Sequence, residues 1–265
     1  MGSTWPRRVR HLATVAALLA LAPTCGSPAA DDEADAVPET TVRAEEITVV
    51  LVGDSVANNL FAPLRAALEG SAETHYVVSL TIPRGDGGRF LWDSTLAEYE
   101  PDVVVVLIGT WEIDKVLGET DYPRSYEAGV VDPFIAQTTS AGAEVVWIGM
   151  PSTRSARSPI MRDLDGVYRD AVRRHGAGAT YIDADDVLTD PDGRWIQTLP
   201  GPDGTLESLR GDDGAHLCPA GAVRVVHQVL DVLAPQWPIT PVDGWETGRW
   251  RTAPSEPHPA ICAEN

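Results

Sequence analysis

Basic side chains are scarce in this sequence of 265 residues. It has 20 lysine and arginine residues against 39 aspartate and glutamate residues, so its formal net charge is -19 and its isoelectric point is near 4.5. Binding to phosphate groups requires clustered cations. The composition therefore argues against nucleic acid or an anionic membrane surface as the main partner. The sequence also has no internal repeat, and no apolar run after the N-terminal region is long enough to span a membrane.

The one long apolar run lies near the N-terminus, at residues 12–22. Three arginines precede it: Arg7, Arg8 and Arg10. The run is too short to span a bilayer comfortably, and a positive segment before an apolar one is typical of an export signal. Residues 26–46 are acidic and poor in large apolar side chains, which predicts a flexible tether. We therefore expect residues 1–25 to be an export signal and the mature protein to work outside the cytoplasm.

Cysteine is equally scarce, with Cys25, Cys218 and Cys262 as the three examples. Cys25 ends the export signal in a context that resembles a bacterial lipoprotein processing site, and the alternative is simple cleavage of the signal. Cys218 and Cys262 then remain as an even pair in an oxidising compartment, where a disulfide is the expected state. We expect an extracytoplasmic protein, either secreted or anchored to the outer face of the membrane through a lipid on Cys25.

Five short apolar runs of strand character follow the tether. They lie at residues 47–52, 76–80, 102–108, 144–148 and 179–182. The segments between them have helical periodicity. This alternation predicts the α/β class, with one parallel sheet covered by helices on both faces. We expect one domain at residues 47–235 and a tryptophan-rich tail at residues 236–265 that packs over it.

The first of these runs ends in Gly53-Asp54-Ser55, and a helical pattern begins at once. Apolar residues recur four positions apart after the serine, at Val56, Leu60, Leu64 and Leu68. A buried strand that turns sharply into a helix lies at the carboxyl edge of an open α/β sheet, where ligands bind. Ser55 is therefore either a nucleophile or the N-cap of the helix, which is the commonest role of a serine in that place.

A serine is a poor nucleophile unless a base takes its proton, and that base is most often a histidine oriented by a carboxylate. Among the six histidines, His216 stands in a loop before the last predicted helix, and Asp213 precedes it by three residues. This spacing lets both side chains point the same way from one turn. The pair is the best base available to Ser55, and the alternative is an Asp-Gly turn with an incidental histidine.

Acyl transfer also needs hydrogen-bond donors for the oxyanion of the tetrahedral intermediate. The backbone N–H of Ser55, at the start of the helix, is one candidate. A second lies in the glycine-rich residues 84–88 after the second strand, although such a segment can equally be an ordinary flexible turn. A third lies at residues 108–112, where the third strand ends.

The order of these blocks resembles the SGNH or GDSL-type hydrolase superfamily. The matching residues are Gly53-Asp54-Ser55 after the first strand, Gly85 after the second, Gly109 after the third, and Asp213 and His216 before the last helix. The resemblance covers essentially all of residues 47–235. It implies a flavodoxin-like three-layer α/β/α sandwich with a five-stranded parallel sheet.

The resemblance also implies a role for each matching residue. Ser55 would be the nucleophile, His216 the general base and acid, and Asp213 the carboxylate that orients the imidazole. The backbone N–H groups of Ser55 and Gly85 would bind the oxyanion. No metal or organic cofactor is implied.

The third block departs from the family pattern. Family members usually carry Gly-x-Asn-Asp there, with the asparagine amide as an oxyanion donor, whereas this chain has Trp111 at the asparagine position and Glu112 after it. The indole N–H of Trp111 is a candidate replacement; alternatively its ring forms a wall of the acyl or sugar pocket, and Glu112 anchors a loop. Loss of such a donor typically slows catalysis about 100-fold or more, which fits slow hydrolysis or a transferase.

Three functions fit these observations. The leading hypothesis is an exported serine esterase that removes a short acyl group from a glycan or small ester through an acyl-enzyme on Ser55. The first alternative is O-acyl transfer to a cell-surface saccharide, because the blocks also look like the SGNH domains attached to membrane O-acyltransferases. The second is a catalytically silent glycan-binding domain. We expect a monomer whose specificity lies in residues 86–92, 111–122 and 183–214.

Overall fold

The computed structural model describes residues 47–117, 121–155, 158–251 and 262. Cys25, the predicted export signal and the predicted tether lie outside these residues and stay predictions. No helix within the described ranges is long and apolar enough to cross a membrane.

The secondary structure alternates between strands and helices along the chain. The strands are β1 (Ile47–Gly53), β2 (Ala72–Val78), β3 (Val103–Leu107), β4 (Glu144–Ile148), β5 (Ala179–Ile182), β6 (Thr198–Pro200) and β7 (Leu206–Ser208). The longer helices are α1 (Ser55–Leu68), α2 (Gly85–Tyr99), α5 (Asp132–Ser140), α6 (Ser158–His175) and α8 (Pro219–Leu233). The short ones are α3 (Ile113–Val116), α4 (Arg124–Tyr126), the π-helix η1 (Glu127–Val131), α7 (Asp185–Leu188), η2 (Trp245–Thr247) and η3 (Arg249–Arg251).

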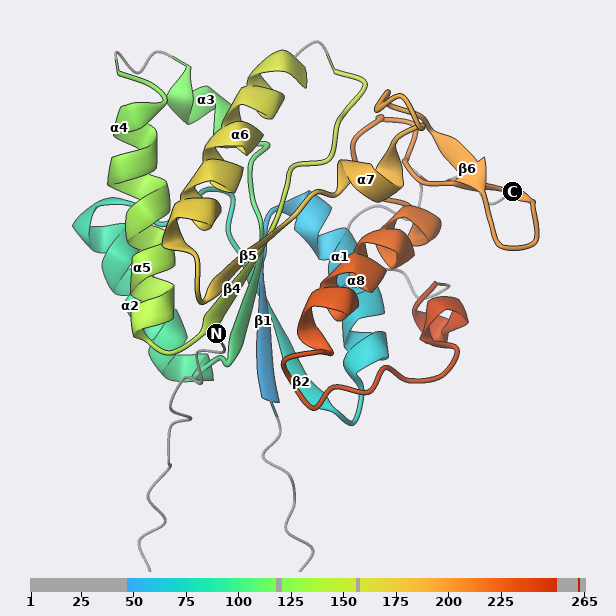
Figure 1. Ribbon diagram of the computed structural model, residues 1–265, viewed down its shortest axis with the longest axis horizontal. Coiled ribbons are helices and arrows are strands. Elements are labelled where there is room, and N and C mark those ends of the chain that lie inside the picture. The colour runs from blue at the N-terminus through green and yellow to red at the C-terminus, as the bar shows by residue number, and fades with distance from the viewer. Residues whose placement is uncertain (1–46, 118–120, 156–157, 252–261, 263–265) are drawn as a thin grey trace, which may run out of the picture. The chain divides into compact units, whose positions relative to one another are not determined.

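Strands β1 to β5 form a parallel sheet in the order β2-β1-β3-β4-β5. This is the flavodoxin-like order, in which β2 is added on one side of β1 and β3, β4 and β5 are added on the other. Helices α1 and α8 cover one face of the sheet, and α2, α5 and α6 cover the other (Figure 1). The predicted α/β class and three-layer sandwich are therefore confirmed. Since all five strands are parallel, the segments that follow them meet at one edge.

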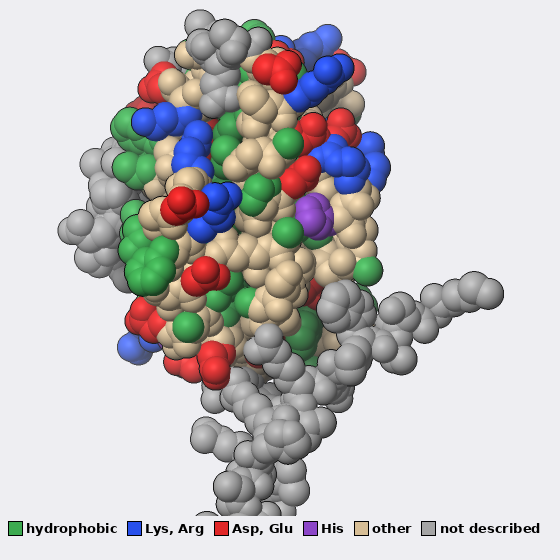
Figure 2. All heavy atoms as spheres, turned by 90° about the vertical axis from the view of Figure 1, so that its left-hand side faces the viewer, with side chains coloured by type: hydrophobic (Ala, Val, Ile, Leu, Met, Phe, Trp, Pro, Cys, Tyr) green, Lys and Arg blue, Asp and Glu red, His purple; other side chains and the backbone are tan. Residues whose placement is uncertain are grey.

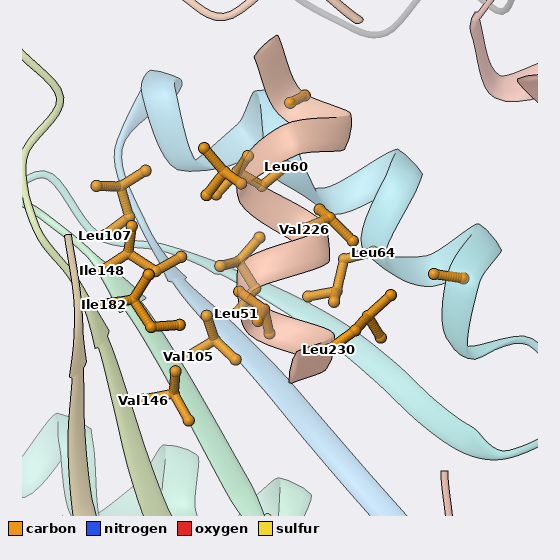
Figure 3. Close-up of a cluster of buried hydrophobic side chains, with 14 of the residues drawn as sticks. Leu51, Leu60, Leu64, Val105, Leu107, Val146, Ile148, Ile182, Val226 and Leu230 are labelled. Carbon is orange, nitrogen blue, oxygen red and sulfur yellow. The ribbon is translucent and has the colours of Figure 1, made fainter. Parts of the chain in front are cut away.

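The central strands are continuously apolar because helices cover both of their faces. All five residues of β3 are buried. Alternate side chains point to opposite faces, and Figure 3 shows the layer in which sheet residues meet α1 and α8. The side chains that meet there are Leu51, Val105, Leu60, Leu64, Val226 and Leu230. The predicted apolar stripe of α1 is buried in this layer, so the helix after Ser55 is confirmed.

Two predicted boundaries near the sheet edge are wrong. Strand β2 begins at Ala72 rather than at residue 76, and its first half is polar because an edge strand is only partly covered. The glycine-rich residues 84–88 are not a loop, since α2 begins at Gly85 and Gly85 itself has a φ of +62°.

Trp92, in the first predicted specificity segment, is a core residue whose indole N–H donates to Thr138 Oγ1 at 2.9 Å.

The predicted polar loop at residues 183–214 contains regular structure. Helix α7 follows β5 directly, and β6 and β7 pair as a short antiparallel hairpin. These elements are three or four residues long and rich in polar side chains. Hydrophobic periodicity cannot reveal elements of that length, because too few residues repeat.

Charged side chains of both signs are interspersed over the face seen in Figure 2, on the side of α2, α4 and α5. Several of them pair. Arg174 lies against Glu127 and Asp132, and Arg89 lies 3.0 Å from Asp86. We interpret this face as a solvated surface, on which such pairs contribute little to stability.

The described part of the tail after α8, up to residue 251, packs on the layer of α1 and α8. Trp245 is buried in that core, and the indole N–H of Trp237 donates to Glu144 Oε2 at 3.1 Å. The backbone N–H of Val242 donates to Ala67 O at 3.0 Å. Cys218, at the start of α8, forms the predicted disulfide with Cys262, with the two Cα atoms 5.6 Å apart.

The disulfide yields the first prediction. Replacing both cysteines, as Cys218→Ser with Cys262→Ser, should lower the free energy of unfolding by about 2–4 kcal/mol, because the bond closes a loop of 44 residues and restricts the unfolded chain. Urea unfolding of the double variant and of the wild type, with and without reductant, measures this. Equal midpoints for all of these samples would contradict the prediction.

Candidate active site

The turn between β1 and α1 places Ser55 at the carboxyl edge of the sheet. Asp54, and not Ser55, is the N-cap of α1, because its Oδ1 accepts a hydrogen bond from the backbone N–H of Val56 at 2.9 Å. The interpretation of Ser55 as the N-cap is therefore wrong. Ser55 is the first residue of the helix, and its hydroxyl is directed to a different partner.

This turn is held by the two strands that flank β1. A Cβ atom on Gly53 would lie 2.1 Å from the carbonyl oxygen of Leu107 in β3, so only glycine fits there. On the β2 side, the hydroxyl of Tyr76 donates to the carbonyl oxygens of Asp54 at 2.7 Å and Gly53 at 3.1 Å. The position of Ser55 is thus fixed by contacts within the sheet.

His216 lies within hydrogen-bond reach of both other residues of the predicted triad. His216 Nε2 is 2.8 Å from Ser55 Oγ, and His216 Nδ1 forms a hydrogen bond with Asp213 Oδ2. The other oxygen, Asp213 Oδ1, accepts from the backbone N–H groups of Ala215 at 3.0 Å and His216 at 3.1 Å. No group of three or more His, Cys, Asp or Glu side chains suited to a metal ion occurs in the described ranges.

The electrostatics of Asp213 suit a carboxylate that orients an imidazole. Partial burial alone would raise the pKa of Asp213, but the hydrogen bonds from the His216 side chain and from two backbone N–H groups outweigh it, so the pKa lies below its ordinary value. Asp213 is therefore ionised at neutral pH. It can hold the proton on Nδ1 of His216 and leave Nε2 to face the serine.

The loop that carries His216 is fastened to three neighbouring segments. The carbonyl oxygen of Gly214 accepts from the backbone N–H of Arg154 and from the indole N–H of Trp195, each at 3.2 Å. The backbone N–H of Leu217 donates to Asn59 Oδ1 at 3.1 Å. Sequence reasoning missed Asn59, although its place four residues after Ser55 puts it on the same side of α1.

A buried arginine lies close to Asp213. Arg210 is fully buried, and its three side-chain nitrogens have no hydrogen-bond partner among the residues that the structure describes. Burial lowers the pKa of Arg210 to about 10, although the negative charges of Asp185 and Asp213 oppose the shift. Arg210 thus brings positive charge to the Asp213 carboxylate. The sequence carried no signal for this, because an arginine in a polar segment is normally solvated.

The segment after β3, at residues 108–112, anchors the segment that leads into α2 at Gly85. Glu112 is fully buried and accepts hydrogen bonds from the backbone N–H of Ile82 and from the guanidinium of Arg84. Arg84 lies over the ring of Tyr126 at 5.6 Å and directly precedes Gly85. The interpretation of Glu112 as a loop anchor is therefore confirmed.

The oxyanion donors stay predictions. Gly85 is the first residue of α2, whose first N–H groups have no partner inside the helix and can face a bound anion. Trp111, at the position of the family asparagine, has 49% of its surface exposed. That exposure suits a residue at the rim of a site, whether it donates a hydrogen bond or forms a wall.

A narrow cavity lies against residues that flank the predicted nucleophile Ser55. Asp54 and Val56, on either side of Ser55, and Ala215, directly before His216, all contribute to its lining. Gly109 and Thr110 of the third block lie on its wall. Its volume is about 10 Å³, close to the smallest space that holds one water molecule.

The buried cap Asp54 yields a pH-dependent prediction. Burial raises the pKa of Asp54, and the hydrogen bond from Val56 N–H opposes the shift without cancelling it. A raised pKa in the folded state means that the folded protein loses stability as pH rises through the unfolded pKa of about 4. Asp54→Asn keeps a cap without charge, so its stability relative to wild type should increase from pH 3 to pH 7.

Asp54→Ala is the matched control, because it removes both the charge and the cap, and loss of the cap costs about 1 kcal/mol. Urea unfolding of the three proteins at several pH values measures both effects. A stability difference between wild type and Asp54→Asn that does not change with pH would contradict the assignment.

The anchor Glu112 yields a third prediction. Glu112→Gln leaves Arg84 without its charged partner, so the free energy of unfolding should fall by about 3 kcal/mol. This value is at the lower end of the range for a broken buried ion pair, because Arg84 is partly exposed. Glu127→Gln is the control, since it breaks the surface pair with Arg174 and should cost less than about 1 kcal/mol. Chemical denaturation compares them, and equal losses would count against an anchoring role.

Known proteins support the same fold. The sequence matches the model of the family described as "Protein of unknown function (DUF459)" over residues 48–232. No curated protein sequence matches the chain. A GDSL-like lipase from Bacteroides thetaiotaomicron VPI-5482 is similar in structure, with a TM-score of 0.52, 9% identity, and coverage of 71% of this chain and 88% of that one.

Two further solved structures are similar. The acetyl xylan esterase AlAXEase has a TM-score of 0.51 at 14% identity and covers 71% of this chain and 100% of its own. LAE5, an alpha/beta hydrolase enzyme from the metagenome of Lake Arreo, has a TM-score of 0.50 at 18% identity, with 70% and 94% covered. The predicted resemblance is confirmed: the chain belongs to the family "Protein of unknown function (DUF459)" and has the fold of the SGNH or GDSL-type hydrolases.

Proposed function

We propose that the protein is an exported serine esterase that removes a short acyl group from a glycan or small ester through an acyl-enzyme on Ser55. The observation that carries the proposal is the chain of hydrogen bonds from Ser55 Oγ to His216 Nε2, at 2.8 Å, and from His216 Nδ1 to Asp213. A serine, an imidazole and a carboxylate in this order make an activated nucleophile.

In the first half of the reaction, Ser55 Oγ attacks the carbonyl carbon of the ester while His216 Nε2 takes the hydroxyl proton. The imidazolium is stabilised by the ionised Asp213. The oxyanion of the tetrahedral intermediate accepts hydrogen bonds from the backbone N–H groups of Ser55 and Gly85. The bond to the alcohol then breaks, the alcohol leaves with the proton from His216, and the acyl group stays on Ser55.

In the second half, a water molecule attacks the acyl carbon and gives a proton to His216. The new tetrahedral intermediate collapses, the bond to Ser55 Oγ breaks, and the serine regains the proton. The products are the carboxylic acid and a free enzyme. The low pKa of Asp213 keeps its carboxylate charged through both halves.

Export and an extracytoplasmic location are supported by the chemistry of the cysteines. The Cys218–Cys262 disulfide needs an oxidising compartment to persist. The arginines and apolar run at the N-terminus match an export signal. A lipid on Cys25 would keep the enzyme at the outer face of the membrane.

Acyl transfer to a saccharide is a second candidate, and Trp111 favours it. Trp111 directly follows Thr110 of the cavity lining, and its exposed indole offers an apolar face on which a sugar ring can lie, at the position where the family pattern has an asparagine donor. The two candidates share the acyl-enzyme and differ in whether water or a sugar hydroxyl accepts the acyl group. Product analysis with and without an oligosaccharide acceptor separates them.

The proposal predicts that Ser55→Ala or His216→Ala lowers kcat/KM for p-nitrophenyl acetate at least about 10³-fold, because each removes part of the activated nucleophile. A fluorophosphonate probe should label Ser55 in the wild type and nothing in Ser55→Ala. The controls are Ser71→Ala and His227→Ala, both remote from the site, which should keep wild-type rates. A folded wild type that neither turns over the ester nor takes the probe would favour the silent glycan-binding alternative.

A further inference from the structure

Two methionines line the cavity that lies against Asp54 and Val56, the neighbours of Ser55. The chain has three methionines, and Met150 and Met161 both line this cavity. Both side chains are nearly buried, with 9% and 6% of their surface exposed. Val56 and Leu107 form other parts of the lining, which is largely apolar although Asp54 and Thr110 also contribute to it. An apolar wall suits the hydrocarbon part of an acyl group rather than the hydroxyls of a sugar.

The thioether of Met150 packs against Gly109, where β3 has ended. A Cβ atom on Gly109 would lie 1.7 Å from Met150 Sδ, so the sulfur rests directly on the glycine backbone. The second sulfur, Met161 Sδ, accepts a weak hydrogen bond from Thr153 Oγ1 at 3.5 Å. Neither side chain can therefore move deeper toward the core without a collision or the loss of a contact.

The backbone that carries Met150 is fixed at three points. The N–H of Met150 donates to Asp165 Oδ1 at 2.9 Å, and the N–H of Ser152 donates to Asp185 Oδ1 at 2.8 Å. The N–H of Arg154 donates to the carbonyl oxygen of the loop that carries His216. Asp165 is itself buried and held by the hydroxyl of Tyr181 at 2.7 Å. The adjustable part of this wall is therefore its side chains.

We infer that Met150 and Met161 set the upper size limit of the acyl group, and that acetyl-sized esters are the substrate class. This rests on the proposed function. The cavity of about 10 Å³ holds roughly one water molecule, and a methyl group is of similar size. A longer chain has to displace the Met150 thioether, which already rests on Gly109. One extra methylene in a closed apolar pocket typically costs about 10-fold or more in kcat/KM.

The test measures kcat/KM for p-nitrophenyl acetate, butyrate and hexanoate with the purified full-length protein. The wild type should prefer acetate over butyrate by about 10-fold or more. Met150→Ala should raise the ratio of butyrate to acetate about 10-fold and change acetate turnover far less. Met161→Ala should shift the ratio in the same direction.

Two controls separate size from other effects. Met150→Leu has nearly the same volume and should keep the wild-type ratio, as should Val242→Ala, which truncates an apolar side chain in the tail. If the wild type is active and Met150→Ala folds but keeps the wild-type ratio of butyrate to acetate, the inference is overturned while the proposed function stands. Should Met150→Ala fail to fold, an unchanged ratio in Met161→Ala overturns it equally. A wild type inactive on every ester overturns the proposed function itself.

Discussion

The cap of α1 by Asp54 is the interaction on which the rest of the site depends. A helix that starts at the edge of a sheet needs an acceptor for its first N–H groups. Because the carboxylate of Asp54 supplies it, the hydroxyl of Ser55 is not consumed by the backbone and can face His216. The cost is a buried carboxyl group with a raised pKa. The close packing of Gly53 against the carbonyl oxygen of Leu107 fixes where the chain turns from β1 into α1.

His216 reaches Ser55 across 161 positions of sequence. It can do so because parallel strands bring every connecting segment to the same edge. The loop of His216 is then held by polar contacts from Asn59 and Trp195. These contacts order the imidazole before any substrate binds, which is how an enzyme reduces the entropic cost of reaction.

The sequence is sufficient for the parts of the fold that follow a long hydrophobic pattern. Buried strands such as β3 and amphipathic helices such as α1 and α8 are visible because many apolar residues repeat. The edge strand β2 and the hairpin of β6 and β7 are not, since they are polar or short. Within the site, local spacing predicts the Asp213 and His216 pair, whereas tertiary contacts decide the cap, Asn59 and Arg210.

The third block shows why the departure from the family pattern need not weaken the whole site. Where relatives carry an asparagine followed by an aspartate, this chain has a half-exposed Trp111 followed by a buried Glu112. The buried carboxylate holds Ile82 and Arg84, and so fixes the segment that presents Gly85. The change at this position therefore comes with a firmer hold on the segment before the predicted donor Gly85. Preorganised backbone donors stabilise an oxyanion without reorganising, so under the proposed function a firmly held Gly85 N–H would serve the acyl-enzyme chemistry of Ser55 even without the asparagine amide.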